Sequence, residues 1–219
     1  MLFRSAGLQG SGKTALLETA AGLQPALAGE VRLCGQRVAW GEGDGSAETR
    51  RRIGIVFEGG GRLFQRLTTA ENIALPLQYH RNAQMEDVAG EVAALMEGCG
   101  LPKVADWPAN RLGRGWQQRV ALARALALGP EILLLDNPLA GLDSVHTRWW
   151  RTFLQGLISR ADGVFGSVRT VVVACDDLRP WMDLGRQFAL ANNGRWKVLG
   201  SRSEVLANPS SEIQMLLDA

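Results

Sequence analysis

The stretch GLQGSGKT, Gly7 to Thr14, decides the fold class. It fits the phosphate-loop pattern G-x-x-x-x-G-K-[ST], and it lies between a short apolar lead, MLF, and a helical pattern, TALLETAAG. The glycines of such a loop permit positive φ, its backbone N–H groups wrap phosphates, and the helix that follows adds the partial positive charge of its N-terminus. The expected nucleotide-binding residues are Gly7, Gly10, Ser11, Gly12, Lys13 and Thr14.

A second stretch, ILLLD from Ile132 to Asp136, completes the expected site. Its unbroken apolar run is typical of a strand buried on both faces of a parallel sheet. Carboxylates at the C-terminal ends of such strands lie where α/β sheets bind ligands, so Asp136 and Thr14 are predicted to hold Mg²⁺ while Lys13 bridges the β- and γ-phosphates. The plainer alternative for Asp136 is a strand cap. The runs IGIVFE and TVVVACDD predict two more buried strands of a largely parallel sheet covered by helices.

Length, composition and charge limit the class of protein. The 219 residues suffice for one α/β domain with a small insertion, and 46% hydrophobic and 21% charged residues are ordinary for a globular protein. A net charge of +2 gives no basis for nucleic-acid binding. We expect a cytoplasmic chain, because no apolar run is long enough for a membrane span or a secretory signal. Cys34, Cys99 and Cys175 have no metal or disulfide spacing and are expected to be buried.

The order of these motifs resembles the ATP-binding subunit of ABC transporters over nearly the whole chain. The matching segments are GLQGSGKT for Walker A, IVFE for the strand into the Q-loop, RLGRGWQQRVALARAL for the signature and its helix, LLLDNP for Walker B, LAGLD for the D-loop with Leu142 and Asp143, and VVVACDD for the H-loop strand. The segments FEGGGRLFQRLTTAENIALPLQYH and NNGRWKVLGSRSEVLANPSSEIQMLLDA most resemble ATPases of Mce-associated phospholipid and organic-solvent transport systems. The resemblance implies Mg·ATP as ligand.

Four positions depart from the family pattern. Glu58 replaces the Q-loop glutamine, Asn137 replaces the glutamate that acts as general base, and Asp176 replaces the switch histidine. In the signature, the serine is lost. The segment that would reach the nucleotide of a second subunit reads Leu112, Gly113, Arg114, Gly115 and Trp116. Arg114 either supplies a cation to that nucleotide or blocks the approach.

These departures predict slower hydrolysis with nucleotide binding retained. An amide at Asn137 cannot take up a proton, and general base catalysis contributes roughly 10²–10⁴ in rate. A carboxylate at Asp176 would repel a γ-phosphate. The alternatives for Glu58 are a relocated base or metal ligand that restores turnover, and an exposed loop acid.

The same resemblance implies the domain organisation. Residues 1–58 and 117–219 are predicted to form the ATP-binding core, and residues 59–116 an inserted helical subdomain. Pro76 is expected to break or kink the first subdomain helix. Leu63, Phe64 and Leu67 are candidates for contact with a membrane subunit, or else belong to the core.

The segment before Gly7 leaves no room for the antiparallel strands that usually precede the phosphate loop in this family. GEVRLCGQRVAW is the stretch that could contribute a reduced antiparallel layer, in which Trp40 is expected to pack. We therefore expect weak adenine recognition if the chain is truly short.

The sequence therefore predicts an ABC-type subunit that docks, from the cytoplasmic face of the plasma membrane, on an integral membrane permease for phospholipid or other hydrophobic cargo. Its second ATP-binding subunit is either a copy of itself or a conventional ATPase. The main alternative is a soluble nucleotide-dependent regulator without a permease. A small-molecule kinase on the same fold is disfavoured, because LAGLD and QQRVALARAL have no role there.

Overall fold

The computed structural model describes residues 2–7, 10–33, 35–37, 44–60, 62–159, 165–192, 194–207 and 211–218. The expectations for Cys34 and Trp40 fall outside these residues. Cys99 and Cys175 are buried, as predicted, and burial raises the pKa of the Cys99 thiol to about 12.

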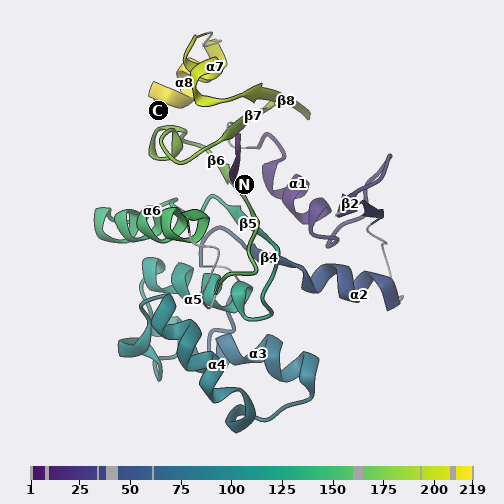
Figure 1. Ribbon diagram of the computed structural model, residues 1–219. Coiled ribbons are helices and arrows are strands. Elements are labelled where there is room, and N and C mark those ends of the chain that lie inside the picture. The colour runs from purple at the N-terminus through teal and green to yellow at the C-terminus, as the bar shows by residue number, and fades with distance from the viewer. Residues whose placement is uncertain are drawn as a thin grey trace.

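A six-stranded sheet forms the centre of the molecule (Figure 1). Its strands, in spatial order, are β4 (Ile53–Val56), β5 (Ile132–Asp136), β6 (Thr170–Cys175), β1 (Leu2–Ala6), β7 (Gln187–Asn192) and β8 (Arg195–Gly200). All neighbours are parallel except β7 and β8, which form an antiparallel edge pair. The predicted parallel sheet is confirmed, whereas β7 and β8 were not expected from the sequence. The phosphate loop follows β1, which lies next to β6, and Asp136 ends β5 on the other side of β6.

Helices cover both faces of this sheet (Figure 1). On one face, α1 (Lys13–Ala20) packs Leu17 against Leu134 of β5 in a small apolar cluster. The larger core lies on the opposite face, where α5 (Arg114–Leu126) and α6 (Ser144–Ser159) bury their apolar sides. In α6, Trp150 and Leu154 are fully buried, as the helical spacing of apolar residues predicts.

The helical region lies beyond the β4 edge of the sheet (Figure 1). It contains α3 (Thr69–Arg81), α4 (Met85–Gly98), and the short 3-10 helices η1 (Pro102–Val104) and η2 (Ala109–Arg111). Of the two expectations for Pro76, a break or a kink, the break is wrong, since α3 continues through this residue. A capping box between Thr68 and Glu71 fixes where α3 begins. The predicted division between residues 116 and 117 falls inside α5, which contacts both α3 and β4.

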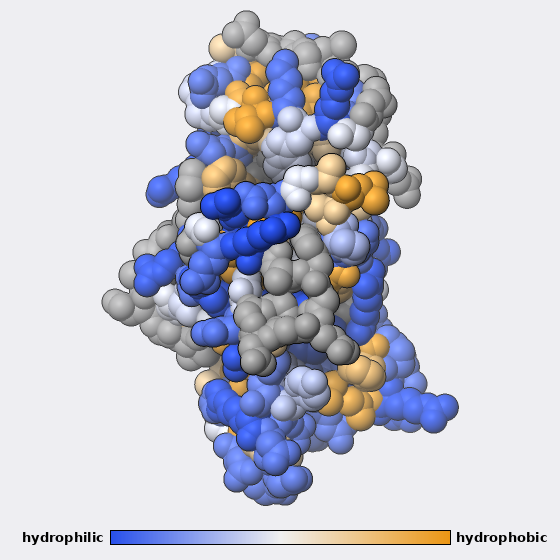
Figure 2. Space-filling view, turned by 90° about the vertical axis from the view of Figure 1, so that its right-hand side faces the viewer, coloured by the Kyte–Doolittle hydropathy of each residue, from blue (hydrophilic) through white to orange (hydrophobic). Residues whose placement is uncertain are grey.

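The remaining elements are short. They are β2 (Arg32–Leu33), β3 (Gln36–Arg37), α2 (Asp44–Arg51), η3 (Arg179–Trp181), α7 (Arg202–Ala207) and α8 (Ser211–Asp218). The antiparallel pair β2–β3 is the reduced layer that the sequence suggested. On the face that carries α1, Figure 2 shows separate apolar groups among polar residues. An apolar groove of about 410 Å³ lies on this side, between Leu16 of α1, Val172 of β6 and Trp196 of β8.

No helix among the described residues is both long and apolar enough to cross a bilayer.

Candidate functional site

The phosphate loop leaves the C-terminal end of β1 at Gly7 and enters α1 at Lys13. A Cβ atom at Gly7 would collide with the backbone carbonyl of Ala191 in β7, so a close approach between two chain segments requires glycine there. Gly10 and Gly12 have φ angles of 82° and 90°, which other L-residues rarely adopt. The glycine spacing of the motif therefore has a direct backbone cause.

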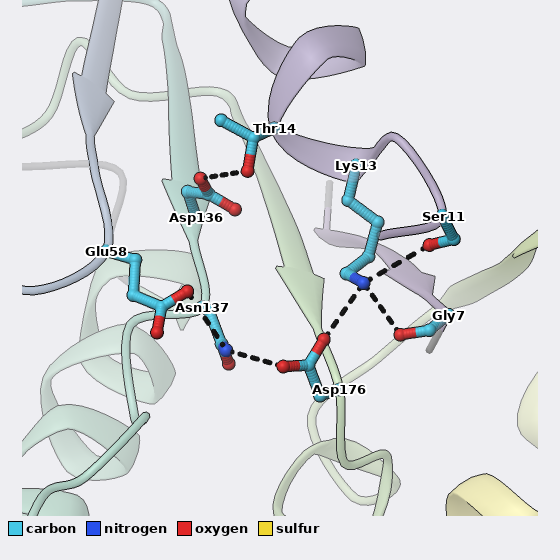
Figure 3. Close-up of polar contacts among 8 residues, drawn as sticks. All are labelled: Gly7, Ser11, Lys13, Thr14, Glu58, Asp136, Asn137 and Asp176. Atoms are coloured by element: carbon cyan, nitrogen blue, oxygen red, sulfur yellow. Dashed lines mark hydrogen bonds and ion pairs between the residues drawn. The ribbon is translucent and has the colours of Figure 1, made fainter. Parts of the chain in front are cut away.

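The Lys13 side chain is buried and folds back over the loop (Figure 3). Its Nζ donates to the Gly7 carbonyl at 2.7 Å and to Ser11 Oγ at 3.3 Å, and it forms an ion pair with Asp176 Oδ1 at 2.9 Å. The ammonium is thus held at the point where a phosphate would enter the loop. Asp176 follows β6, the strand beside β1, which explains how it reaches Lys13.

The predicted metal ligands meet as expected. Thr14 Oγ1 donates to Asp136 Oδ2 at 2.7 Å, across a separation of 122 residues in the chain. Burial, together with the nearby negative charges of Glu58 and Asp176, raises the pKa of Asp136, although the Thr14 hydrogen bond and the Lys13 charge oppose this. A divalent cation at this position would relieve the penalty of keeping the Asp136 carboxylate ionised and buried.

Asn137 connects two acidic side chains at the end of β5 (Figure 3). Its Nδ2 donates to Asp176 Oδ2 at 2.9 Å and to Glu58 Oε2 at 3.4 Å. Its own backbone has a φ of 42°, a left-handed conformation that asparagine tolerates better than most residues. The three substituted positions predicted to shape hydrolysis therefore form one hydrogen-bonded group, Glu58–Asn137–Asp176.

The loop that carries Glu58 is tied to both neighbouring helices. The backbone N–H of Gly60 donates to Oε1 of buried Gln118 in α5 at 3.2 Å. Arg62 pairs with buried Glu18 of α1 at 2.8 Å. These two contacts tie Gly60 and Arg62, which lie close to Glu58 in the chain, to α5 and α1.

The predicted signature segment begins α5. Leu112 is buried, Gly113 is the N-cap, and Arg114 is the first helical residue. Arg114 Nη2 lies 3.6 Å from Glu58 Oε1, and a Cβ atom on Gly141 would come within 2.9 Å of Arg114 Nη1. In the single chain, Arg114 thus lies between the Glu58 loop and the D-loop of its own subunit.

The next two signature residues pack inward. A Cβ atom at buried Gly115 would overlap the ring of His146, so glycine leaves the space that this imidazole fills. Trp116 meets the His146 ring edge to face at 5.3 Å between centroids. The guanidinium of buried Arg119 lies 4.9 Å from the Trp116 ring and 4.0 Å from the Trp149 ring. Trp116 therefore anchors α5 to α6.

The D-loop residues precede α6 directly. Leu142 is partly buried against the main core. Asp143 is exposed, and its Oδ1 accepts a hydrogen bond from the His146 N–H at 2.8 Å. Backbone hydrogen bonding from His146 lowers the pKa of Asp143. This contact gives Asp143 a role in starting α6.

These residues fit a magnesium nucleotide. The loop supplies glycine backbone and a lysine ammonium, and the Thr14–Asp136 pair supplies a hydroxyl and a carboxylate. Among the described residues, no group of three or more His, Cys, Asp or Glu side chains is arranged to hold a metal alone. Mg²⁺ typically takes one or two protein ligands and completes its shell with water and substrate phosphates, so this sparse set suits it.

Sequence reasoning missed the Lys13–Asp176 and Arg114–Glu58 pairs. Both strand ends were visible in the sequence, but the pairing of Asp176 with Lys13 depends on β1 lying next to β6. The contact of Arg114 depends on how α5 packs beneath β4. Strand order, which apolar periodicity does not reveal, was the missing information.

Known proteins with sequences similar to this chain include ATP-binding proteins of import systems. The family model described as ABC transporter matches residues 6–140. The sulfate/thiosulfate import ATP-binding protein CysA of Synechococcus elongatus is 34% identical over 95% of this chain, and the chain covers 57% of that protein. The Fe(3+) ions import ATP-binding protein FbpC of Streptomyces coelicolor is 36% identical over 93% of this chain and is covered to 55%. The chain thus spans little more than half the length of these relatives.

Two solved structures have the same fold. CbiO1 from Clostridium perfringens, part of the ABC transporter complex CbiONQ, superposes with a TM-score of 0.79 at 22% identity, covering 94% of this chain and 79% of that one. The ATP-binding cassette MJ0796, a dimer in a post-hydrolysis state with ADP and Pi, superposes with a TM-score of 0.77 at 30% identity, covering 90% of this chain and 85% of that one. From its motifs, its fold and these relatives, the chain belongs to the ABC transporter family, as an ATP-binding domain.

Proposed function

We propose that this chain is the ATP-binding subunit of an ABC import system, that it binds Mg·ATP, and that it hydrolyses ATP slowly. The observation that carries the proposal is the assembled Lys13, Thr14 and Asp136 set, with Thr14 Oγ1 2.7 Å from Asp136. Lys13 binds phosphate oxygens, and Thr14 with Asp136 holds the cation. Slow hydrolysis is inferred from Asn137, whose amide cannot accept the proton of an attacking water.

A second candidate, hydrolysis with Glu58 as the base, has a specific observation in its favour. Glu58 Oε2 lies 3.4 Å from the Asn137 amide nitrogen, so a carboxylate stands next to the position where the family has its glutamate. Against this role, the Glu58 carboxylate is already engaged by two partners, the Arg114 guanidinium at 3.6 Å and the Asn137 amide. We therefore rank Glu58 as base below slow hydrolysis.

The partner we propose is an integral membrane permease, contacted from the cytoplasmic face. Support comes from the relatives, whose names describe import ATP-binding proteins, and from CbiO1, part of a transporter complex. On the helical region, Phe64 has 59% of its surface exposed and is the best of the three predicted contact residues, since Leu63 is buried and Leu67 is partly so. The relatives named above import sulfate, thiosulfate or iron, so they favour an inorganic ion over the phospholipid cargo that the sequence suggested.

Affinity purification from detergent-solubilised membranes of the source cell tests the partner. We expect the tagged chain to retain an integral membrane protein in fixed stoichiometry, and Phe64→Glu to weaken that association while the variant stays folded. Recovery of the chain from the soluble fraction alone, without a membrane protein, would support the regulator alternative. The same preparation shows whether the second ATP-binding subunit is another copy of this chain.

A further inference from the structure

The Asp176 carboxylate forms an ion pair with Lys13, the residue that would bind the terminal phosphate of a nucleotide. Lys13 Nζ donates to two oxygens of the loop itself, the Gly7 carbonyl and Ser11 Oγ. It also forms an ion pair with Asp176 Oδ1 at 2.9 Å, and this partner carries a negative charge. An ammonium has three N–H donors, so a phosphate oxygen that binds Lys13 competes with an oxygen already present.

The position of Asp176 indicates which phosphate it opposes. Figure 3 shows its carboxylate between the Lys13 ammonium and the Asn137 amide, on the side of Lys13 away from the loop residues Gly7 and Ser11. The loop backbone wraps the inner phosphates, and the lysine extends to the β- and γ-phosphates. Asp176 therefore lies on the side where the terminal phosphate would bind, and ADP, which lacks that group, should compete less with the ion pair than ATP does.

A second contact helps to orient the Asp176 carboxylate in the chain without nucleotide. Asn137 Nδ2 donates to its other oxygen, Oδ2, at 2.9 Å, so both carboxylate oxygens have partners. The Lys13 side chain is 8% exposed and that of Asp176 is 44% exposed. The lysine end of the pair is shielded from solvent, whereas Asp176 can swing outward when a more strongly charged anion arrives.

From this arrangement we propose that Asp176 is an internal competitor for the γ-phosphate and lowers the preference of the site for ATP over ADP. The inference rests on the proposed function, because it requires a site that binds both nucleotides. It makes Asp176 a specificity-determining residue. A subunit with Asp176 discriminates weakly between ATP and ADP until the carboxylate is displaced from Lys13.

Equilibrium titration of the full chain with Mg·ATP and Mg·ADP tests the proposal, using Asp176→Asn. Removing the charge while keeping the shape should lower the Kd for ATP by about tenfold, the effect of losing one charge-assisted contact, and change that for ADP by less than about twofold. Asp176→Ser is the second variant, and it removes the carboxylate with a smaller side chain. Either variant suffices if the other does not fold.

Asp177→Asn is the matched control. It removes the same charge one residue away, where the carboxylate is paired with Arg179 at 2.8 Å. Its ratio of ATP to ADP affinity should stay at the wild-type value. A ratio unchanged in both Asp176 variants, or raised equally by Asp177→Asn, would overturn the role of Asp176 and leave the proposed function intact. Wild-type chain that binds neither nucleotide would instead overturn the proposed function, and this inference with it.

Discussion

At the scale of single residues, three carboxylates share the space beside the phosphate loop. Asp136, Glu58 and Asp176 each come from a different strand end, and Asn137 donates to two of them. An amide at position 137 therefore suits its surroundings, because a glutamate there would place a fourth negative charge among acceptors. Glu58, Asn137 and Asp176 are therefore physically linked in this chain.

The raised pKa of Asp136 predicts a pH dependence of magnesium binding. Mg²⁺ requires the ionised carboxylate, and burial, followed by the charges of Glu58 and Asp176, makes Asp136 hold its proton to higher pH. As the pH is lowered, affinity for Mg·ADP should therefore begin to fall at a higher pH than an ordinary aspartate ligand would give. The effect on stability has the opposite sign. Protonated Asp136 favours the folded state, so its contribution to the free energy of unfolding is lost as the pH rises through its raised pKa.

Calorimetric titration of Mg·ADP at several pH values measures this effect. Asp136→Asn is the control, because it has no proton to lose at this position. Magnesium-free ADP corrects for protonation of the nucleotide itself. Equal pH dependence in the wild type and in Asp136→Asn would contradict the assignment of Asp136 as the titrating metal ligand.

At the scale of elements, the start of α5 depends on its fit against α6. Gly115 of α5 faces His146 of α6, and Trp116 covers the same imidazole. The ring atoms nearest to Gly115 include Cγ, at the root of the side chain, so a small rotation cannot clear them. The signature segment is therefore fixed to the D-loop helix of its own subunit by packing.

Gly115→Ala should lower the free energy of unfolding by about 1–3 kcal/mol, the usual cost of overpacking a filled site. Gly156→Ala in α6 is the matched control, because open space surrounds Gly156. It should raise stability by about 0.5–1 kcal/mol through helix propensity. Urea unfolding of both variants measures the difference, and His146→Ala should relieve most of the Gly115→Ala penalty. Equal effects at the two glycines would disprove the packing argument.

Sequence patterns predicted which segments form helices and strands better than they predicted which elements lie side by side. The runs around Ile132 and Thr170 gave buried strands because each is apolar on both faces. Pro76 did not end α3, because the neighbouring turns and a buried apolar face outweigh one missing hydrogen bond. The edge strand β8 was not predicted, although Trp196 and Val198 alternate with Arg195 and Lys197. All four residues are exposed, so no buried face marks this strand.

At the scale of the whole molecule, we infer that nucleotide binding and nucleotide hydrolysis depend on two different groups of residues. The backbone glycines, Lys13, Thr14 and Asp136 form a complete set for holding a magnesium nucleotide. The Glu58–Asn137–Asp176 group, with Arg114 beside it, lies at the positions where we propose that hydrolysis is altered. Under the proposed function, the first set suffices to bind Mg·ATP, and the Glu58–Asn137–Asp176 group leaves hydrolysis slow.

Steady-state phosphate release with Mg·ATP, measured on the same sample as ATP binding, tests this separation most directly. The Lys13→Ala variant provides the background, and Glu58→Gln tests the relocated base. We expect saturable ATP binding that Lys13→Ala abolishes. Phosphate release by the wild type should be about 10²–10⁴-fold slower than that of an ATPase with a general base. Glu58→Gln should leave this rate unchanged. Fast release that depends on both Lys13 and Glu58 would contradict the account and make Glu58 the base.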